Sequence, residues 1–177
     1  MQRKYITMSH ASKQQNRRQD LQNAIEKVVI NAGVGRAGQQ SNFQEKILPQ
    51  IMRDIGLISG QKPETRPSRI SIAGFKMREG QIVGIRVTLR RAKMVDFLER
   101  LITIVLPRVK DFRGLSLTNI DERGVLNIGF REQFVFPEVN VEESPFVFPL
   151  GVNIVPRRKS RGAAIETYRA LGIPLKK

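Results

Sequence analysis

One short motif in this chain has the spacing of a phosphate-binding turn. Residues 33–38 read Gly-Val-Gly-Arg-Ala-Gly, and an acidic residue, Asp54, follows about 20 residues later, as dinucleotide folds require. In those folds the acidic residue ends a second parallel strand, whereas Asp54 lies inside a helical pattern and is followed by Ser-Gly-Gln-Lys-Pro at 59–63. The context therefore argues against a dinucleotide cofactor. We expect the glycines to form a turn whose backbone approaches a neighbour, such as a phosphate of RNA.

Other groups that could do chemistry are sparse. The chain has one histidine, His10, and no cysteine, which excludes a His-based triad, a multi-His metal site, a disulfide and a thiol nucleophile. A proline-broken stretch gathers Glu132, Glu138, Glu142 and Glu143. Two of them could in principle act as an acid and a base, but nothing in the sequence gives them different environments. We expect no catalytic residue, no metal and no cofactor, and interpret the stretch as a solvated acidic loop or one that meets a basic neighbour.

The composition points to an anionic partner. The chain has 31 Lys and Arg against 16 Asp and Glu, a formal net charge of +15 and a pI of about 11.1. Such a balance favours nucleic acid or an anionic membrane surface as the partner. A length of 177 residues with 40% hydrophobic content suits one well-packed domain. No apolar run approaches the ~20 residues that cross a bilayer, so we expect a soluble protein.

The clearest pattern is an alternating strand. Residues 82–91 contain no acidic residue, and from Val83 onwards apolar residues alternate with small, polar or cationic ones. Successive side chains on a strand point to opposite faces. The predicted core face comprises Val83, Ile85, Val87 and Leu89, and the predicted outer face comprises Gly84, Arg86, Thr88 and Arg90. An ordinary solvated face would mix both charge signs, so this cationic face predicts a surface on which a phosphate backbone can lie.

The remaining periodicity predicts an α+β fold with a mixed or antiparallel sheet, helices packed on one face and the other face open. Helical spacing predicts helices at 43–55, 94–105 and 161–171. Pro49 should kink or restart the first of these helices, and Pro107 should end the second. Buried or alternating runs predict further strands at 27–32, 126–134 and 152–155.

The first segment differs from the rest of the chain. It is cationic, and no carboxylate precedes Asp20. An Arg-rich, acid-poor start is also typical of an organellar transit peptide, but the apolar residues are too few and too clustered for an amphipathic helix. We therefore predict a basic N-terminal arm at 1–23, which orders on nucleic acid, and a single α+β domain at 24–177.

The stretch 71–80 holds one aromatic residue among glycines and cations. Phe75 follows Gly74 and precedes Lys76 and Arg78. This pattern predicts a loop tip with an exposed ring, although the spacing fits a ring at the edge of the core equally well. The two cations should be exposed in either case.

Several segments together resemble the large-subunit ribosomal protein five family. They are Ser-Gly-Gln-Lys-Pro at 59–63, Ala-Gly-Phe-Lys at 73–76, Val-Thr-Leu-Arg at 87–90, the block from Phe97 to Ser116, Arg-Glu-Gln at 131–133 and Phe-Pro-Glu at 136–138. The resemblance extends over roughly residues 24–177, and the block from Phe97 to Ser116 is specific enough to indicate the family alone. Members of this family bind 5S ribosomal RNA in the central protuberance of the large subunit.

The resemblance implies a structural, non-enzymatic role in a ribosome, either cytoplasmic or organellar. It implies that 5S rRNA lies on the open sheet face and the strand-end loops, through Asn31, Gly33, Gly35, Gln61, Lys62, Arg66, Arg86, Thr88 and Arg90. It also implies that the loop near the Gly-Phe-Lys element reaches the elbow of the peptidyl-site tRNA, through Gly74, Phe75, Lys76 and Arg78. The other implied partners are large-subunit rRNA, neighbouring proteins of the central protuberance and a protein of the small-subunit head. The resemblance implies no contact with a membrane.

The chain departs from the family pattern in places. Ile70 stands where members tend to have a basic residue, which weakens one expected phosphate contact. Pro156 cannot donate a ladder hydrogen bond, so the last strand should be short or at an edge of the sheet.

Two other classes of protein would explain parts of the sequence. A membrane-surface protein would explain the charge, but it requires a helix with a cationic polar face, whereas the helix near 94–105 carries Asp96 and Glu99 beside Arg100. A nucleotide-dependent enzyme would explain the glycine turn, but it lacks the strand that should follow.

Overall fold

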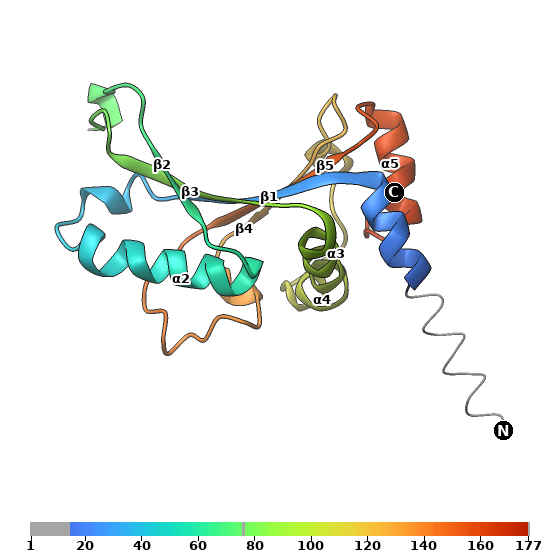
Figure 1. The fold of residues 1–177 in the computed structure, drawn as a ribbon, viewed down its shortest axis with the longest axis horizontal. Helices are drawn as coiled ribbons and strands as arrows, with labels where there is room; N and C mark the ends of the chain where they lie inside the picture. The colour runs from blue at the N-terminus through green and yellow to red at the C-terminus, as the bar shows by residue number, and fades with distance from the viewer. Residues whose placement is uncertain (1–14, 76, 177) are drawn as a thin grey trace.

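The computed structural model describes residues 15–75 and 77–176, which fold around a five-stranded antiparallel sheet (Figure 1). Its strand order is β2-β3-β1-β5-β4. The strands are β1 (Ile25–Gly33), β2 (Glu64–Pro67), β3 (Ile82–Leu89), β4 (Leu126–Phe130) and β5 (Leu150–Pro156). Because β1 pairs with β3 on one side and with β5 on the other, segments far apart in the sequence form one continuous surface.

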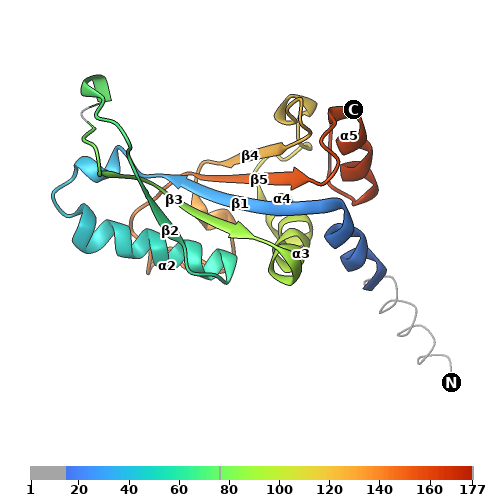
Figure 2. The ribbon, with the colours of Figure 1, turned by 45° about the horizontal axis from the view of Figure 1, so that its top comes forward.

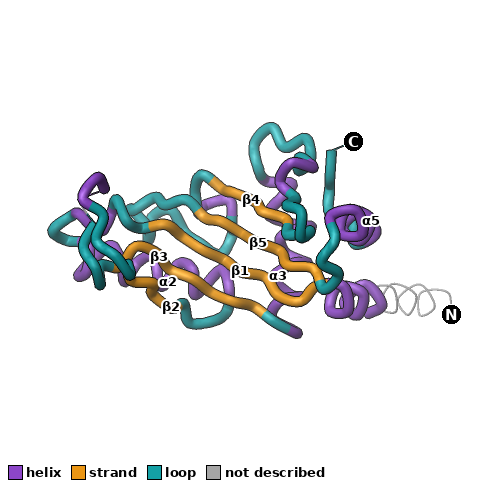
Figure 3. The backbone as a smooth tube through the Cα atoms, turned by 90° about the horizontal axis from the view of Figure 1, so that it is seen from above, coloured by secondary structure: helices purple, strands orange, loops and turns teal. Residues whose placement is uncertain are grey.

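The helices lie on one side of this sheet and at one end of it. α2 (Leu48–Ser59) and α3 (Arg91–Arg100) cover one face, and α4 (Leu106–Arg108) continues α3 after a π-helical turn (Figures 1 and 2). α5 (Arg161–Ala170) and a helix at residues 15–24 lie at one end of the sheet. In the ranges that the structure describes, no helix covers the opposite face (Figure 3). The predicted α+β fold with helices packed on one face is confirmed.

The alternation of side chains along the strands accounts for the two faces. Val87 and Leu89 of β3 are 1% and 0% exposed. In register, Val87 faces Ile30 of β1, which faces Val152 of β5, and Val152 faces Ile128 of β4. Each such side chain contributes about 1.5–3 kcal/mol when it is fully buried. One apolar row across the sheet therefore supplies the sheet's share of the core.

Several boundaries differ from the predicted ones. Pro49 restarts its helix as predicted, because a π-helical turn ends where α2 begins. Pro107 lies in α4, which continues the π-helical turn without a break and ends one residue later at Arg108, so the helix stops within one residue of the predicted end. Pro156 is the last residue of β5, so its missing N–H falls at the end of the strand and interrupts no pairing. β5 lies between β1 and β4, so the expectation of a short or edge strand is wrong. β4 ends at Phe130 and not at 134, and Val83 at the start of β3 is only half-buried.

The helix at residues 15–24 packs against the domain. Leu21 is fully buried, and Arg18 forms ion pairs with two carboxylates of α3. The last part of the predicted arm, 1–23, therefore lies against the sheet and helix layer. Residues 1–14 are outside the described residues, and a basic arm stays a prediction for them.

A buried polar cluster joins α2 to the proline-broken loop between β4 and β5. Asp54 is 1% exposed and accepts a hydrogen bond from the Ser144 hydroxyl at 2.8 Å. One turn earlier, the Gln50 side chain donates to the carbonyl of Phe146 at 3.0 Å and accepts from its N–H at 3.3 Å. Burial raises the pKa of Asp54, and the hydrogen bonds from Ser144 and Gln50 oppose that rise only in part. Asp54 thus has a structural role.

The acidic stretch meets basic neighbours, which is one of the two predicted interpretations. Glu143 pairs with Arg53 of α2, and Glu138 pairs with Arg100 of α3. These pairs hold the loop against the helix layer. Glu138 and Glu143 are therefore partners of arginines, whereas Glu132 and Glu142 are exposed and form no ion pair with a described residue.

A buried hydroxyl anchors the last helix. Tyr168 of α5 is fully buried, and its hydroxyl lies 2.7 Å from the carbonyl oxygen of Gly124 and 3.0 Å from that of Ile154. Burial raises the pKa of Tyr168, so the hydroxyl keeps its proton and remains a donor. Gly124 has a φ of 80°, and a Cβ there would lie 2.7 Å from the Cβ of Ala164. The turn before β4, the strand β5 and α5 therefore meet where only a glycine fits.

We expect the change Tyr168→Phe to lower the free energy of unfolding by about 1–3 kcal/mol, because it removes the one buried hydroxyl proton that two carbonyl oxygens share while the ring stays. Urea denaturation measures this change. The control is Thr103→Val, which removes an exposed hydroxyl bonded to the carbonyl of Glu99, and it should cost less than about 0.5 kcal/mol. Equal effects of the two changes would contradict the anchoring role of Tyr168.

Candidate nucleic-acid interface

The face without helices carries one continuous set of outward side chains from neighbouring strands. Arg86 of β3 lies opposite Asn31 of β1 on one side and opposite Glu64 of β2 on the other. At the next outward position, Arg66 of β2 and Gly33 of β1 lie on either side of a glycine of β3. We call this surface the open face. Most of the residues predicted to bind rRNA, which belong to four separate segments of the chain, meet on it.

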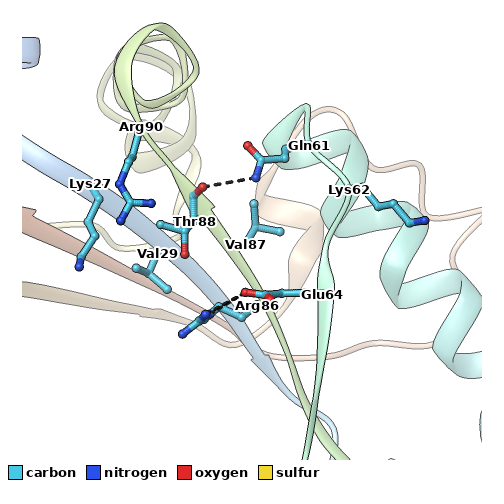
Figure 4. Close-up of a pocket in the computed structure, with 9 residues that line it drawn as sticks. All are labelled: Lys27, Val29, Gln61, Lys62, Glu64, Arg86, Val87, Thr88 and Arg90. Carbon is cyan, nitrogen blue, oxygen red and sulfur yellow. Dashed lines mark hydrogen bonds and ion pairs between the residues drawn. The ribbon is translucent and has the colours of Figure 1, made fainter.

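A polar groove of about 550 Å³ follows β3 on the open face (Figure 4). Lys27 of β1 and Arg90 at the end of β3 line it on one side. Across from them, the Gln61 amide donates to the backbone carbonyl of Thr88 at 3.4 Å, which ties the connection after α2 to the strand. Lys62 lines the groove as well, but its side chain points away from Lys27 and Arg90. The groove is thus lined mainly by polar groups.

The open face is not purely cationic, which corrects the expectation drawn from the alternating strand. One oxygen of Glu64 accepts hydrogen bonds from Arg66 at 2.7 Å and from Arg86 at 2.8 and 3.1 Å. These side chains are 42% to 53% exposed, so each ion pair is screened by water and contributes at most about 1 kcal/mol. A phosphate can therefore compete with this carboxylate for either arginine.

Two other predicted residues keep their charges unpaired. Lys62 and Arg90 are exposed, and the described part of the chain offers neither of them an acidic partner. Arg90 has extended backbone angles at the start of α3, whose first turn holds no acidic residue. These two side chains are the cations of the open face that are most available to a polyanion.

The glycine motif is a turn at the end of β1 and not a cofactor loop. The Val34 N–H bonds to the carbonyl of Val83 at 2.9 Å, and a 3-10 turn follows in place of a long helix. A Cβ at Gly38 would lie 3.0 Å from the side-chain nitrogen of Gln81, so the chain approaches its neighbour closely there. Since every pairing within the sheet is antiparallel, the parallel strand pair of a dinucleotide fold is absent from the described chain. The expectation of a structural turn is confirmed.

The glycines of the motif face different neighbours. Gly33 is exposed on the open face, and a Cβ added there would have nothing within 4 Å, so an RNA backbone could lie directly on it. Gly35 is half-buried, and a Cβ there would lie 3.7 Å from the sulfur of Met77. Gly35 therefore lies against the Met77 side chain of the β2–β3 loop, at the margin of the open face.

The predicted tRNA-contact residues Gly74, Phe75, Lys76 and Arg78 belong to the β2–β3 loop. This loop rises above the open face at the end of the sheet that is far from α5 (Figure 1). Two backbone hydrogen bonds between Ile72 and Met77, at 3.0 and 3.2 Å, close its tip. Gly74 and Arg78 are exposed. Lys76 and the side chain of Phe75 lie outside the described residues, so both interpretations of that ring stay open.

Sequence reasoning missed some residues of the open face. Lys27, Val29 and Glu64 line the groove, but none was predicted to belong to it. Lys27 and Val29 alternate with inward residues of β1, a period-2 signal that the continuous apolar run Val-Val-Ile conceals. Glu64 lies in a four-residue strand that shows no periodicity of its own.

The described residues show neither a metal-binding cluster nor a membrane-spanning helix. No group of three or more His, Cys, Asp or Glu side chains among them is placed to hold a metal ion. None of the described helices is long and apolar enough to cross a membrane. The fold and the open face thus define a basic α+β protein with an exposed, mainly polar sheet surface.

Comparison with known proteins identifies the family. Residues 22–78 match the family model of ribosomal protein L5, and residues 82–175 match the model of the C-terminus of the same ribosomal family. Large ribosomal subunit protein uL5 of Chlorobaculum tepidum is 43% identical over 153 residues, which cover 86% of this chain and 81% of that protein. The proteins of the same name from Rubrobacter xylanophilus and Syntrophomonas wolfei are 47% and 43% identical over 152 residues, which cover 86% of this chain and 82% and 83% of theirs.

The chain belongs to the uL5 family of ribosomal proteins. This confirms the resemblance found in the sequence. Because this family consists of structural ribosomal proteins, the chain is not an enzyme.

We expect the change Glu64→Gln to strengthen binding of the protein to RNA of unrelated sequence, because it frees Arg66 and Arg86 from their shared carboxylate. Affinity for a single-stranded RNA should rise a few-fold, and its salt dependence should steepen by about 0.7 units of log-log slope for each additional phosphate that the arginines bind. Fluorescence anisotropy across a salt series measures both. The change Glu45→Gln, at an exposed carboxylate just before α2, removes the same charge elsewhere and should have a smaller effect. An unchanged slope for Glu64→Gln would show that the two arginines are not accessible to phosphate.

Proposed function

We propose that this chain is a structural constituent of the large ribosomal subunit that binds 5S rRNA with its open face. The observation that carries the proposal is the gathering of cations and small polar residues from β1, β2 and β3 on one exposed sheet surface of a uL5-family protein. The relatives named above are proteins of the large ribosomal subunit, which supports the proposal that this chain is part of the same subunit.

The chemistry of the open face suits folded RNA. An A-form helix presents phosphates and 2′-hydroxyls over a wide, shallow groove, and proteins recognise it mainly through these groups. Lys62 and Arg90 supply unpaired cations for phosphates, while Gln61 and Thr88 supply neutral polar groups. The exposed glycine at 33 lets a backbone approach the sheet. Affinity should therefore depend strongly on salt, and sequence preference should be modest outside looped bases.

The test is 5S rRNA binding across a salt series. We expect Arg90→Gln to lower the affinity and to reduce the log-log salt slope by about 0.7–0.9, the contribution of one phosphate contact. The control is Lys46→Gln, which neutralises an exposed cation on the π-helical turn before α2 and should leave the slope unchanged. If the wild-type protein does not prefer 5S rRNA over an unrelated RNA of equal length, the proposed function is wrong. If the two variants behave alike, the assignment of Arg90 is wrong.

In the assembled ribosome, we place the β2–β3 loop against the elbow of the peptidyl-site tRNA. The loop stands clear of the sheet at one end, its backbone is closed by the Ile72–Met77 bridge, and Arg78 is exposed. Such a projecting tip can reach a ligand that the open face does not contact. Family resemblance supplies the identity of that ligand. It likewise supplies large-subunit rRNA, neighbouring proteins of the central protuberance and a small-subunit head protein as further partners.

We expect ribosomes that carry Arg78→Gln to release tRNA from the peptidyl site a few-fold faster than wild-type ribosomes, because the variant cannot hold a phosphate with a charged group. Filter binding of labelled tRNA to purified ribosomes measures the dissociation rate. Arg123→Gln, an exposed cation in the turn before β4 at the other end of the sheet, is the control and should leave the rate unchanged. An equal rate for Arg78→Gln and wild type would remove this residue from the tRNA contact.

A further inference from the structure

Three asparagines form a chain of amides across the open face. Asn31 of β1 donates from its side-chain nitrogen to the side-chain oxygen of Asn153 on β5 at 3.0 Å. Asn153 donates in the same way to Asn127 on β4. In the register of the sheet Asn153 and Asn127 are direct partners, and Asn31 is the diagonal neighbour of Asn153. This row extends the open face from the polar groove towards β4.

A glycine determines how the first amide lies. Gly151 is the register partner of Asn31, and a Cβ there would lie only 2.1 Å from the side-chain oxygen of Asn31. The Asn31 side chain therefore lies flat over Gly151 instead of standing up from the sheet. Gly129 is the partner of Gly151 on β4, and a Cβ added at Gly129 would have no other atom within 4 Å. Of these two adjacent glycines, only Gly151 is needed to seat the amide.

The far end of the row sets the direction of every amide in it. The Asn127 nitrogen lies 3.4 Å from the backbone carbonyls of Asn119 and Val125, which can only accept hydrogen bonds. The oxygen of Asn127 must therefore face Asn153, which donates to it, and the oxygen of Asn153 must in turn face Asn31. Within the described residues, no donor reaches the remaining oxygen of Asn31. The row thus ends next to the polar groove in the side-chain oxygen of Asn31, a free acceptor whose orientation is fixed by the backbone carbonyls at the other end of the row.

A carbonyl oxygen cannot bind a phosphate, which has no proton to donate. It selects an N–H or O–H group. On RNA these groups are the ribose 2′-hydroxyls and the amino and imino groups of bases. Arg86 lies opposite Asn31 on β3 and can take a phosphate while the amide takes a neighbouring donor.

We propose that the Asn31–Asn153–Asn127 row is an RNA-recognition element in which the side-chain oxygen of Asn31 accepts a hydrogen bond from the RNA, and Asn153, Asn127 and Gly151 act as positioning residues. This inference rests on the proposed function and assigns the neutral, donor-selecting part of the same surface.

The test compares Gly151→Ala with Gly129→Ala. Both add one methyl group to adjacent positions of the same surface, but only the first displaces the Asn31 amide. We expect Gly151→Ala to weaken 5S rRNA binding by about fivefold to tenfold, the loss of one neutral hydrogen bond, with an unchanged salt slope because every phosphate contact remains. Gly129→Ala should stay within about twofold of wild type. Thermal melts of the free variants establish that both are folded.

Three results would overturn the inference: equal effects of the two changes, wild-type affinity for Gly151→Ala, or a decrease in salt slope of the size that removal of a cation causes. If wild-type protein itself fails to prefer 5S rRNA, the proposed function fails first, and that outcome is separate from the others.

A second arm identifies the donor. The affinities of wild type and Asn31→Ala are compared for 5S rRNA carrying 2′-deoxynucleotides in one segment at a time, and for RNA with inosine in place of guanosine. A 2′-hydroxyl donor predicts that one deoxy segment weakens wild type several-fold but not Asn31→Ala. A guanine amino donor predicts the same pattern for inosine alone. If every modified RNA weakens both proteins equally, the donor is neither a 2′-hydroxyl nor a guanine amino group. If Asn31→Ala binds unmodified 5S rRNA with wild-type affinity, Asn31 contacts no donor, and the inference is wrong.

Discussion

The fully buried apolar residues of the sheet occupy the inward positions of its strands, so the outward side chains do not have to fill the core. On β3 this division places Ile85, Val87 and Leu89 against the helices and leaves Arg86 and Thr88 on the open face. A charged side chain at one of the inward positions would lose its hydration at a cost of several kcal/mol, whereas at an outward position it keeps its water. A slip of one residue in register would exchange the two sets. The pairing of β1 with β3 and β5 thus establishes the core and the open face in a single step.

The acidic residues increase the asymmetry between the two sides. On the helix side, Arg18, Arg53 and Arg100 each pair with a carboxylate of a neighbouring element, and these pairs dock the first helix and the β4–β5 loop. On the open face, Glu64 holds two arginines through one oxygen, so that group still carries a net positive charge. Arg90 has no acidic partner in the described chain. Cations are therefore paired with carboxylates where elements pack together, while Arg90 and Lys62 stay unpaired beside the open face, and unpaired cations favour the approach of a polyanion.

Features formed by residues close together in the sequence could be predicted, whereas features formed by pairing of distant segments could not. The alternation of β3 and the helical stripes are local patterns, so the fold class and the two faces could be predicted from them. β2 could not, because Glu64–Pro67 shows no periodicity and becomes a strand only by pairing with β3. The charge of Glu64 on the open face was missed for the same reason. Asn31 and Gln61 entered the prediction through family resemblance alone, since nothing in their local sequence marks them. Asn127 and Asn153 become neighbours of Asn31 only through the register of three strands.

The proposed interface combines two kinds of contact that differ in mobility. Arginine and lysine side chains such as Arg90 and Lys62 are long and exposed, so they can adjust to phosphates whose positions vary, and they contribute affinity that salt weakens. The amides of the asparagine row are short, bonded to one another and held over Gly151, so the direction of their free acceptor depends on the backbone of β1, β4 and β5. A mobile cation can bind a polyanion in many orientations. A fixed hydrogen-bond acceptor binds the RNA only in orientations that place a donor group within hydrogen-bond distance of that acceptor. On this sheet the first kind would hold the RNA and the second would determine how it lies, because the strands that orient the amides are the same ones whose inward residues form the core.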